Sequence, residues 1–277
     1  MKIQSNLIII ISIITNLILA TVLIYNLSVA SDGANPSLKY PLLDLSRNYI
    51  DQKYFLVNFT PLRDQLENYL NAQSDYQISL YFEYLHTGSF IWLNQQLRTP
   101  PASLTKVPVA MVMYKEIEQG KRLLSDEHLL TAADKDPRWG SLHQQPVGTP
   151  LTWQQLIEAS LQNSDNTAHK ILYDTITTES AQSFAQSVGV TELFDKNGNT
   201  SVREIGRLFR SLYTASYLNR ANSQQILQFL QAASYDQLLK YQSPHPIASK
   251  YGIDINQGVY NEAGIVYLPH SPYLIAV

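Results

Sequence analysis

The sequence predicts an α+β fold in which an antiparallel sheet is flanked by helices and carries a large all-helical insertion. Strand patterns occur only at residues 77–94 and after residue 246, whereas the long stretch between them has the periodicity of helices. The chain has no internal repeat and no low-complexity tract. We therefore expect one domain over residues 61–277, with a sheet part at 61–96 and 246–277 and a helical part at 97–245.

Residues 1–31 are expected to form a membrane anchor or a signal segment. No charged residue occurs from Ile3 to Ser31, and residues 7–27 are mostly Ile and Leu. As a helix this run would span about 30 Å, the thickness of a bilayer's hydrocarbon core. The small residues at 28–30 would suit a signal peptidase, but the apolar run is longer than a usual signal sequence. Lys2 places the amino terminus in the cytoplasm and the rest outside, so we expect a membrane-anchored, extracytoplasmic protein. A buried core helix is the disfavoured alternative.

The next segments are a linker, a helix and a hairpin. Residues 32–60 mix Gly, Pro, Ser and Asn with isolated apolar residues, which is typical of a tether. Residues 61–72 carry Leu at three positions four apart, with Pro in the first turn, and this predicts a helix. Residues 77–86 then alternate apolar and polar side chains before a Thr-Gly turn, and residues 89–94 continue extended, as in a β-hairpin.

The middle of the chain is expected to be helical. Two capping boxes, Thr152 with Gln155 and Ser201 with Glu204, mark helix starts, and Gly189 marks an end. From these start and end signals and from the apolar periodicity, we expect helices at residues 104–119, 151–161, 167–174, 180–188 and 202–213. Strand patterns return at 247–253 and 264–268, across Gly258, and a third strand begins at 272–277.

Composition excludes several function classes. The chain has no cysteine, so it has no disulfide, no thiolate nucleophile and no cysteine-ligated metal. A net charge of −3 leaves no basic surplus for a phosphate backbone, and we expect no nucleic-acid partner. The six histidines form no metal-binding pair, and the chain lacks a Gly-x-Ser-x-Gly elbow, a P-loop and a Gly-x-Gly-x-x-Gly turn. We expect no metal site.

Three short motifs remain that could carry chemistry. Ser103 and Lys106 are three residues apart at a helix start, so the amine can reach the hydroxyl, as an acylating serine with a lysine base requires. Ser164-Asp165-Asn166 lies between two expected helices, and Lys250-Tyr251-Gly252 lies on a late strand. Each has an ordinary structural alternative: a solvated lysine, a helix cap and an edge-strand lysine.

Taken together and in this order, the three motifs resemble those of the class A serine β-lactamases and their penicillin-binding relatives, which carry Ser-x-x-Lys, Ser-Asp-Asn and Lys-Thr/Ser-Gly. The separation of 61 residues between Ser103 and Ser164 is close to that of the family. The resemblance covers residues 61–277 and includes Trp-Gly-Ser-Leu at 139–142 and Gly-Ile-Val-Tyr at 264–267.

The resemblance implies a role for each motif. Ser103 would be the nucleophile, Lys106 its base, and Ser164 a relay that protonates the leaving nitrogen. The backbone N–H groups of Ser103 and Ile253 would hold the oxyanion, and no cofactor would be needed. The substrate-binding residues it implies are Asn166, Lys250, Tyr251, Gly252 and Ile253.

The chain also departs from the family pattern. Tyr251 stands where the family has Thr or Ser to hold a substrate carboxylate, a task that Ser249 or the Tyr251 hydroxyl would have to take over. The Glu-x-x-Leu-Asn motif that activates the deacylating water is missing, and Glu192 is the one acid of suitable type in the short segment after Gly189. The family's last strand is followed by a further helix, so we expect the native gene to encode residues beyond Val277.

The expected function is that of an extracytoplasmic serine hydrolase that opens β-lactam rings through an acyl-enzyme. Two alternatives stay open: a D-alanyl-D-alanine carboxypeptidase-like enzyme acting on peptidoglycan stem peptides, which the missing deacylation motif favours, and a non-catalytic cell-envelope binding protein on the same fold, which Tyr251 favours. The expected partners are thus a β-lactam or a stem peptide and, through residues 7–27, the membrane.

Overall fold

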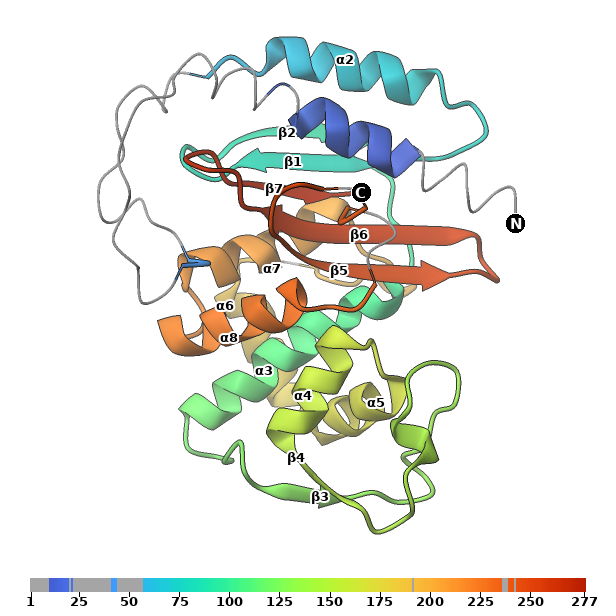
Figure 1. Cartoon of the computed structure of the whole chain (residues 1–277), viewed down its shortest axis with the longest axis vertical. Coiled ribbons are helices and arrows are strands. Elements are labelled where there is room, and N and C mark those ends of the chain that lie inside the picture. Colours follow the sequence, from blue (N-terminus) through green and yellow to red (C-terminus); the bar gives the residue numbers. More distant parts are fainter. Residues whose placement is uncertain are drawn as a thin grey trace.

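The computed structural model describes residues 10–19, 21, 41–43, 57–190, 192–235, 239–241 and 243–277. Its centre is an antiparallel sheet of five strands in the order β2-β1-β7-β6-β5 (Figure 1). The predicted α+β class with an antiparallel sheet is confirmed. The strands are β1 (Leu80–Tyr84), β2 (Ser89–Leu93), β5 (Ile247–Asp254), β6 (Val259–Val266) and β7 (Tyr273–Ala276).

The sheet separates two apolar cores, and β7 shows how the sequence achieves this. Leu274 and Ala276 belong to the core on the inner face, whereas Tyr273 and Ile275 belong to the core on the outer face. Successive strand side chains point to opposite faces, so a strand covered on both sides is apolar throughout. This explains why residues 272–277 carry no polar alternation.

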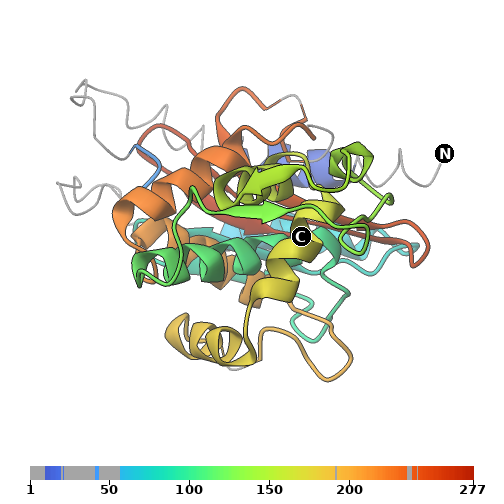
Figure 2. The same ribbon diagram turned by 90° about the horizontal axis from the view of Figure 1, so that it is seen from below.

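The helical part covers the inner face of the sheet, with α7 packing on β6 and β7 and α8 on β5 (Figures 1 and 2). A small two-stranded sheet, β3 (Glu127–Leu129) with β4 (Pro150–Thr152), lies at the far end. The helices are α3 (Lys106–Glu118), α4 (Trp153–Gln162), α5 (Asn166–Thr175), α6 (Thr178–Ser187), α7 (Val202–Thr214) and α8 (Arg220–Gln231), with short 3-10 turns at η2 (Ala102–Thr105) and η3 (Leu142–Gln144).

The outer face is covered by α2 (Thr60–Asn71) and by the helical residues 10–19, which lie beside it in Figure 1. Leu62 and Leu66 of α2 are fully buried, as are Ile14 and Ile18, and all four belong to one apolar cluster. In this structure residues 10–19 therefore pack against the sheet.

No helix among the described residues is long and apolar enough to cross a membrane. The expected anchor at 7–27 is described only at residues 10–19 and 21, and the expected cleavage site at 28–30 lies outside the described residues. Most of the expected linker, residues 32–60, lies outside them as well.

Most element predictions are confirmed, including the helix at 61–72, the hairpin, and the Thr152–Gln155 capping box, in which both reciprocal hydrogen bonds form. Two are wrong in detail, and one helix was not predicted. The helix expected at 151–161 begins at Trp153, because residues 150–152 pair as strand β4. Helix α8 was not predicted because its first two turns, Arg-Ala-Asn-Ser-Gln-Gln, are polar. Strand β6 begins at Val259 rather than 264, because it buries Asn261 and Glu262 through hydrogen bonds that an apolar pattern does not reveal.

Candidate active site

The site is built around the 3-10 turn η2, which carries Ser103 into α3. Ala102 has a left-handed backbone with φ of 47°, and the Thr105 hydroxyl donates to its carbonyl at 3.0 Å. Behind the turn, Asn261 donates to the Pro100 carbonyl at 2.8 Å and accepts from the Thr99 hydroxyl at 3.1 Å. These bonds fix the position of the serine from the side of the sheet.

Strand β5 approaches this turn closely at Gly252. A Cβ added at Gly252 would lie 2.3 Å from the Pro101 carbonyl oxygen, a distance that no side chain tolerates. Glycine is therefore required for the strand to lie against the turn. The contact brings Ile253, the next residue along β5, to the edge of the site.

Lys106 joins the first two motifs. Its Nζ lies 2.9 Å from Ser103 Oγ, 3.1 Å from Ser164 Oγ, 2.6 Å from the Ser164 carbonyl oxygen and 2.8 Å from Asn166 Oδ1. The side chain is 1% exposed. Burial lowers the pKa of Lys106 to about 8, against the opposing pull of Asp165 and Asp136. About a tenth of the lysine is thus neutral at pH 7, and a neutral amine is a proton acceptor beside the serine hydroxyl.

The second motif lies in the loop between α4 and α5. Ser164 has a left-handed backbone with φ of 55° and is almost fully buried. Asp165 is the N-cap of α5: its carboxylate accepts from the Ala168 N–H at 2.9 Å and also from the N–H groups of Ser141 and Leu142, at 2.7 and 2.9 Å. The middle residue of the motif therefore holds the neighbouring loop to the site, a role that the sequence alone did not assign.

Gly140 makes that clamp possible, and its replacement tests the clamp. With φ of +93°, a Cβ at Gly140 would lie 2.1 Å from the Asp165 carboxylate and 2.6 Å from its Cα. We expect Gly140→Ala to lower the thermal unfolding midpoint far more than Gly148→Ala. Gly148 has φ of +89° and nothing within 4 Å, so its replacement costs only the backbone strain, about 1–2 kcal/mol. Equal unfolding midpoints for the two variants would contradict this assignment.

Lys250 is fully buried between the sheet and the helical part. Its Nζ donates to the Leu161 carbonyl at 3.1 Å and lies 4.8 Å from the centre of the Tyr251 ring. Burial, and next the charge of Lys106, holds the pKa of Lys250 well below its ordinary value. The third motif therefore reaches the site, with its ammonium group enclosed by protein.

Tyr251 forms the rim of the site on the side of β5. Its ring packs on Tyr235 with centroids 4.2 Å apart and is 6% exposed. Burial raises the pKa of the Tyr251 phenol, against the opposing effect of hydrogen bonding with the side chains of Ser164 and Trp139. Ser249, the other candidate for a hydroxyl at this place, is instead buried beside Glu262, whose carboxylate it stabilises.

His169 is a site residue that the sequence analysis missed. It lies one turn after Asn166 on α5, and its Nε2 is 3.3 Å from Thr105 Oγ1, on the turn that carries the serine. Burial, followed by the charges of Lys106 and Lys250, lowers the pKa of His169 to about 4, so its imidazole is neutral at pH 7. Its spacing of three residues from Asn166 placed it on the same helix face, which was the available signal.

Glu192 is not brought together with these residues. It is exposed, and its carbonyl oxygen accepts from Arg98 at 3.1 Å on the segment that leads to α7. Within the described residues, no carboxylate hydrogen-bonds to the side chain of Ser103, Lys106 or Ser164. Nor do His, Asp and Glu side chains in that part of the chain gather into a group that could hold a metal ion.

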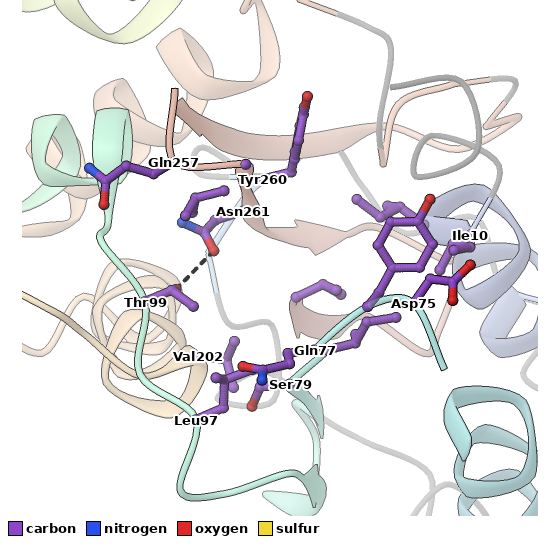
Figure 3. Close-up of a pocket in the computed structure, with 16 residues that line it drawn as sticks. Ile10, Asp75, Gln77, Ser79, Leu97, Thr99, Val202, Gln257, Tyr260 and Asn261 are labelled. Atoms are coloured by element: carbon purple, nitrogen blue, oxygen red, sulfur yellow. Dashed lines mark hydrogen bonds between the residues drawn. The ribbon is translucent and has the colours of Figure 1, made fainter. Parts of the chain in front are cut away.

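A separate cavity of about 300 Å³ lies at another place, between the chain end and the amino-terminal helix (Figure 3). Thr99 and Asn261, which hydrogen-bond to each other behind the serine turn, line one side of the cavity, while Ile10 and Asp75 line another. None of the eight residues predicted for the site lines this cavity. The predicted site residues therefore lie elsewhere, at the junction between η2, α5 and β5.

The chain is similar in sequence to known proteins over most of its length. The family model described as the β-lactamase enzyme family matches residues 61–277. The chain is 26% identical over 207 residues to β-lactamase VEB-1 of Pseudomonas aeruginosa. The matched region covers 65% of this chain and 69% of that protein.

Solved structures share the fold. PBP-A matches with a TM-score of 0.71 and 23% identity over 78% of this chain and 86% of that one, and a variant of PBP-A was solved as an acyl-enzyme complex with penicillin G. A β-lactamase from Sphaerobacter thermophilus matches with a TM-score of 0.70 and 21% identity over 79% and 88% of the two chains. Because the family model spans both the sheet part and the helical part, and so all three motifs, this chain belongs to the β-lactamase enzyme family.

Proposed function

We propose that this protein is an extracytoplasmic serine acyl hydrolase of the class A β-lactamase type, which opens β-lactam rings through an ester on Ser103. The observation that carries the proposal is the 2.9 Å contact between Lys106 Nζ and Ser103 Oγ, made by a buried lysine whose pKa is lowered to about 8. A nucleophile beside a base that is partly neutral at working pH is what acyl transfer requires.

In the proposed acylation, the neutral Lys106 amine takes the hydroxyl proton of Ser103 while Oγ attacks the lactam carbonyl carbon. The carbonyl oxygen becomes negative between the backbone N–H groups of Ser103 and Ile253. The carbon–nitrogen bond then breaks. The nitrogen receives a proton from Ser164 Oγ, and the Lys106 ammonium, 3.1 Å away, returns a proton to Ser164. The side chain of Asn166, whose Oδ1 faces Lys106, leaves its amide N–H₂ to orient the substrate.

The substrate class is proposed on two supports. Membership of the family favours hydrolysis of a cyclic amide, and the PBP-A variant forms an acyl-enzyme with penicillin G. The location outside the cytoplasm and the attachment to the membrane through residues 7–27 are proposed from the uncharged amino-terminal run alone. Insertion into a membrane would require residues 10–19 to leave their packing on the outer face of the sheet.

A peptidase of the D-alanyl-D-alanine type is the second candidate. It uses the same acylation chemistry, and the missing Glu-x-x-Leu-Asn motif favours it over a fast lactam hydrolase. A non-catalytic envelope-binding protein is a third, favoured by Tyr251. Release of D-alanine from a stem pentapeptide would support the second candidate, and the absence of any acylation would support the third.

The test of the proposal is intact-protein mass spectrometry after mixing the protein with benzylpenicillin. We expect a mass increase equal to one penicillin, located at Ser103 by peptide mapping and absent in Ser103→Ala. Ser89→Ala, on the exposed end of β2, is the matched control and should acylate like the parent. No adduct combined with no loss of penicillin would overturn the proposal.

Acylation should also depend on pH through Lys106. Because the neutral amine is the base and the pKa of Lys106 is about 8, the acylation rate should rise with pH to a midpoint near 8. At pH 7 about a tenth of the lysine is neutral, and below that each pH unit should cost about tenfold in rate. Stopped-flow or quenched-flow measurement of adduct formation between pH 5.5 and 9.5 would check this, and a flat profile would contradict it.

A further inference from the structure

The ring of Tyr251 lies over the buried lysine of the third motif. Tyr251 follows Lys250 on β5, at the edge of the sheet that borders the serine turn. The Lys250 ammonium lies 4.8 Å from the centre of the Tyr251 ring, and the ring also packs on Tyr235, 4.2 Å away. The ring is therefore held in place by contacts with both neighbours.

The phenol end of the same side chain reaches across to the helical part. Hydrogen bonding of the phenol with the side chains of Ser164 and Trp139 opposes the rise that burial causes in its pKa, and the whole residue is 6% exposed. Tyr251 thus connects the sheet part with the loop that carries the proposed proton relay. Because the ring lies over Lys250 and that lysine is 0% exposed, a ligand group that reached its ammonium from the side of the ring would have to displace Tyr251.

The lysine and arginine side chains around the site determine how strongly it attracts an anionic ligand group. An anionic ligand group would be attracted to the ammonium forms of Lys106 and Lys250, both of which are buried at the site. Lys250 is 0% exposed and already donates to the Leu161 carbonyl oxygen. Arg138, an exposed cation on the neighbouring loop, is paired with both carboxylate oxygens of Asp136. The attraction that remains for an anion is therefore much weaker than the sequence motif suggests.

We propose that Tyr251 is a specificity-determining residue that shields Lys250 from anionic ligand groups, so that the site favours uncharged acyl donors over donors with a carboxylate beside the scissile amide. This inference rests on the proposed function, because it concerns which substrates acylate Ser103. A threonine at 251 would remove the ring, leave a hydroxyl on the strand and open a path to the ammonium.

The experiment compares two ligands that differ only in charge, benzylpenicillin and its methyl ester, by the rate of adduct formation at Ser103. We expect the parent to acylate with the ester at least as fast as with the free acid. In Tyr251→Thr the ratio of acid to ester rates should rise at least tenfold. Adding Lys250→Met to that variant should abolish the rise, because the gain comes from the exposed cation.

Two further variants separate the ring from its hydroxyl and from general effects. Tyr251→Phe keeps the ring and should keep the parent's acid-to-ester ratio. Tyr241→Thr removes a half-exposed tyrosine that makes none of these contacts and should keep it too. The parent's own ratio tests the inference even if Tyr251→Thr does not fold.

The shielding role of Tyr251 and the acylation of Ser103 can be contradicted separately. A parent that prefers the free acid by more than tenfold, or a folded Tyr251→Thr with an unchanged ratio, would overturn the shielding role while leaving Ser103 as the nucleophile. No adduct with either ligand in any variant would overturn the proposed function and, with it, this inference.

Discussion

Lys106→Met is expected to slow acylation of Ser103 by about a thousandfold while the protein stays folded. The lysine is the one side-chain base within hydrogen-bonding distance of Ser103 Oγ among the described residues. Proton transfer by a positioned base contributes about 10²–10⁴ in rate. Methionine fills a similar volume without a proton acceptor. The measurement is the rate of adduct formation with benzylpenicillin at pH 8, near the pKa of Lys106.

Stability provides the control for that variant. The folded-state pKa of Lys106 is lowered from 10.5 to about 8, so the charged lysine opposes folding at all pH values below about 8, and the cost is lifted as pH rises toward 10.5. Replacing it removes this cost together with its hydrogen bonds, and we expect the unfolding midpoint at pH 7 to stay within a few degrees of the parent's. Lys121→Met, at an exposed position just after α3, is the matched control and should acylate normally. Parent-like acylation by Lys106→Met would exclude the lysine as base.

The parts of the site that the sequence predicted are those set by local geometry. Ser103 and Lys106 meet because three residues separate them at a helix start, and their hydrogen bond follows from that spacing. The partners Ser164 and Asn166 were found through the family's motif order. Their contact with Lys106 depends on how α3 packs against α5, which no local pattern gives.

The parts that were not predicted depend on contacts between distant segments. Asp165 looked like one more motif residue, yet its carboxylate holds the 140–142 loop. His169 became a site residue only through its contact with Thr105, which lies 64 positions earlier in the chain. The stacking of Tyr251 on Tyr235 likewise joins a strand to the loop after α8. Such pairings are fixed by tertiary packing, which spacing along the chain does not encode.

The acyl-enzyme formed with benzylpenicillin is expected to persist for minutes or longer. Deacylation needs a water molecule that a base deprotonates near the ester. The family's motif for that base is missing, and Glu192 lies exposed beside Arg98 instead of at the site. His169 is neutral at pH 7, but a group with a pKa of about 4 is a proton acceptor about a thousandfold weaker than one with a pKa of 7. We therefore expect deacylation to be much slower than acylation.

The measurement is a time course of the adduct by intact-protein mass spectrometry after free penicillin has been removed. An adduct that disappears within seconds would contradict the prediction, and the pH dependence of its loss would then identify the base.

Loss of the adduct that is independent of pH above about 5 and is slowed in His169→Asn would point to the imidazole, whose pKa is about 4. Loss that rises through pH 8 would point to Lys106, which must be neutral to act a second time. Loss slowed only in Glu192→Gln would mean that the segment before α7 moves toward the ester, because in the structure that carboxylate makes no hydrogen bond to the side chain of Ser103, Lys106 or Ser164.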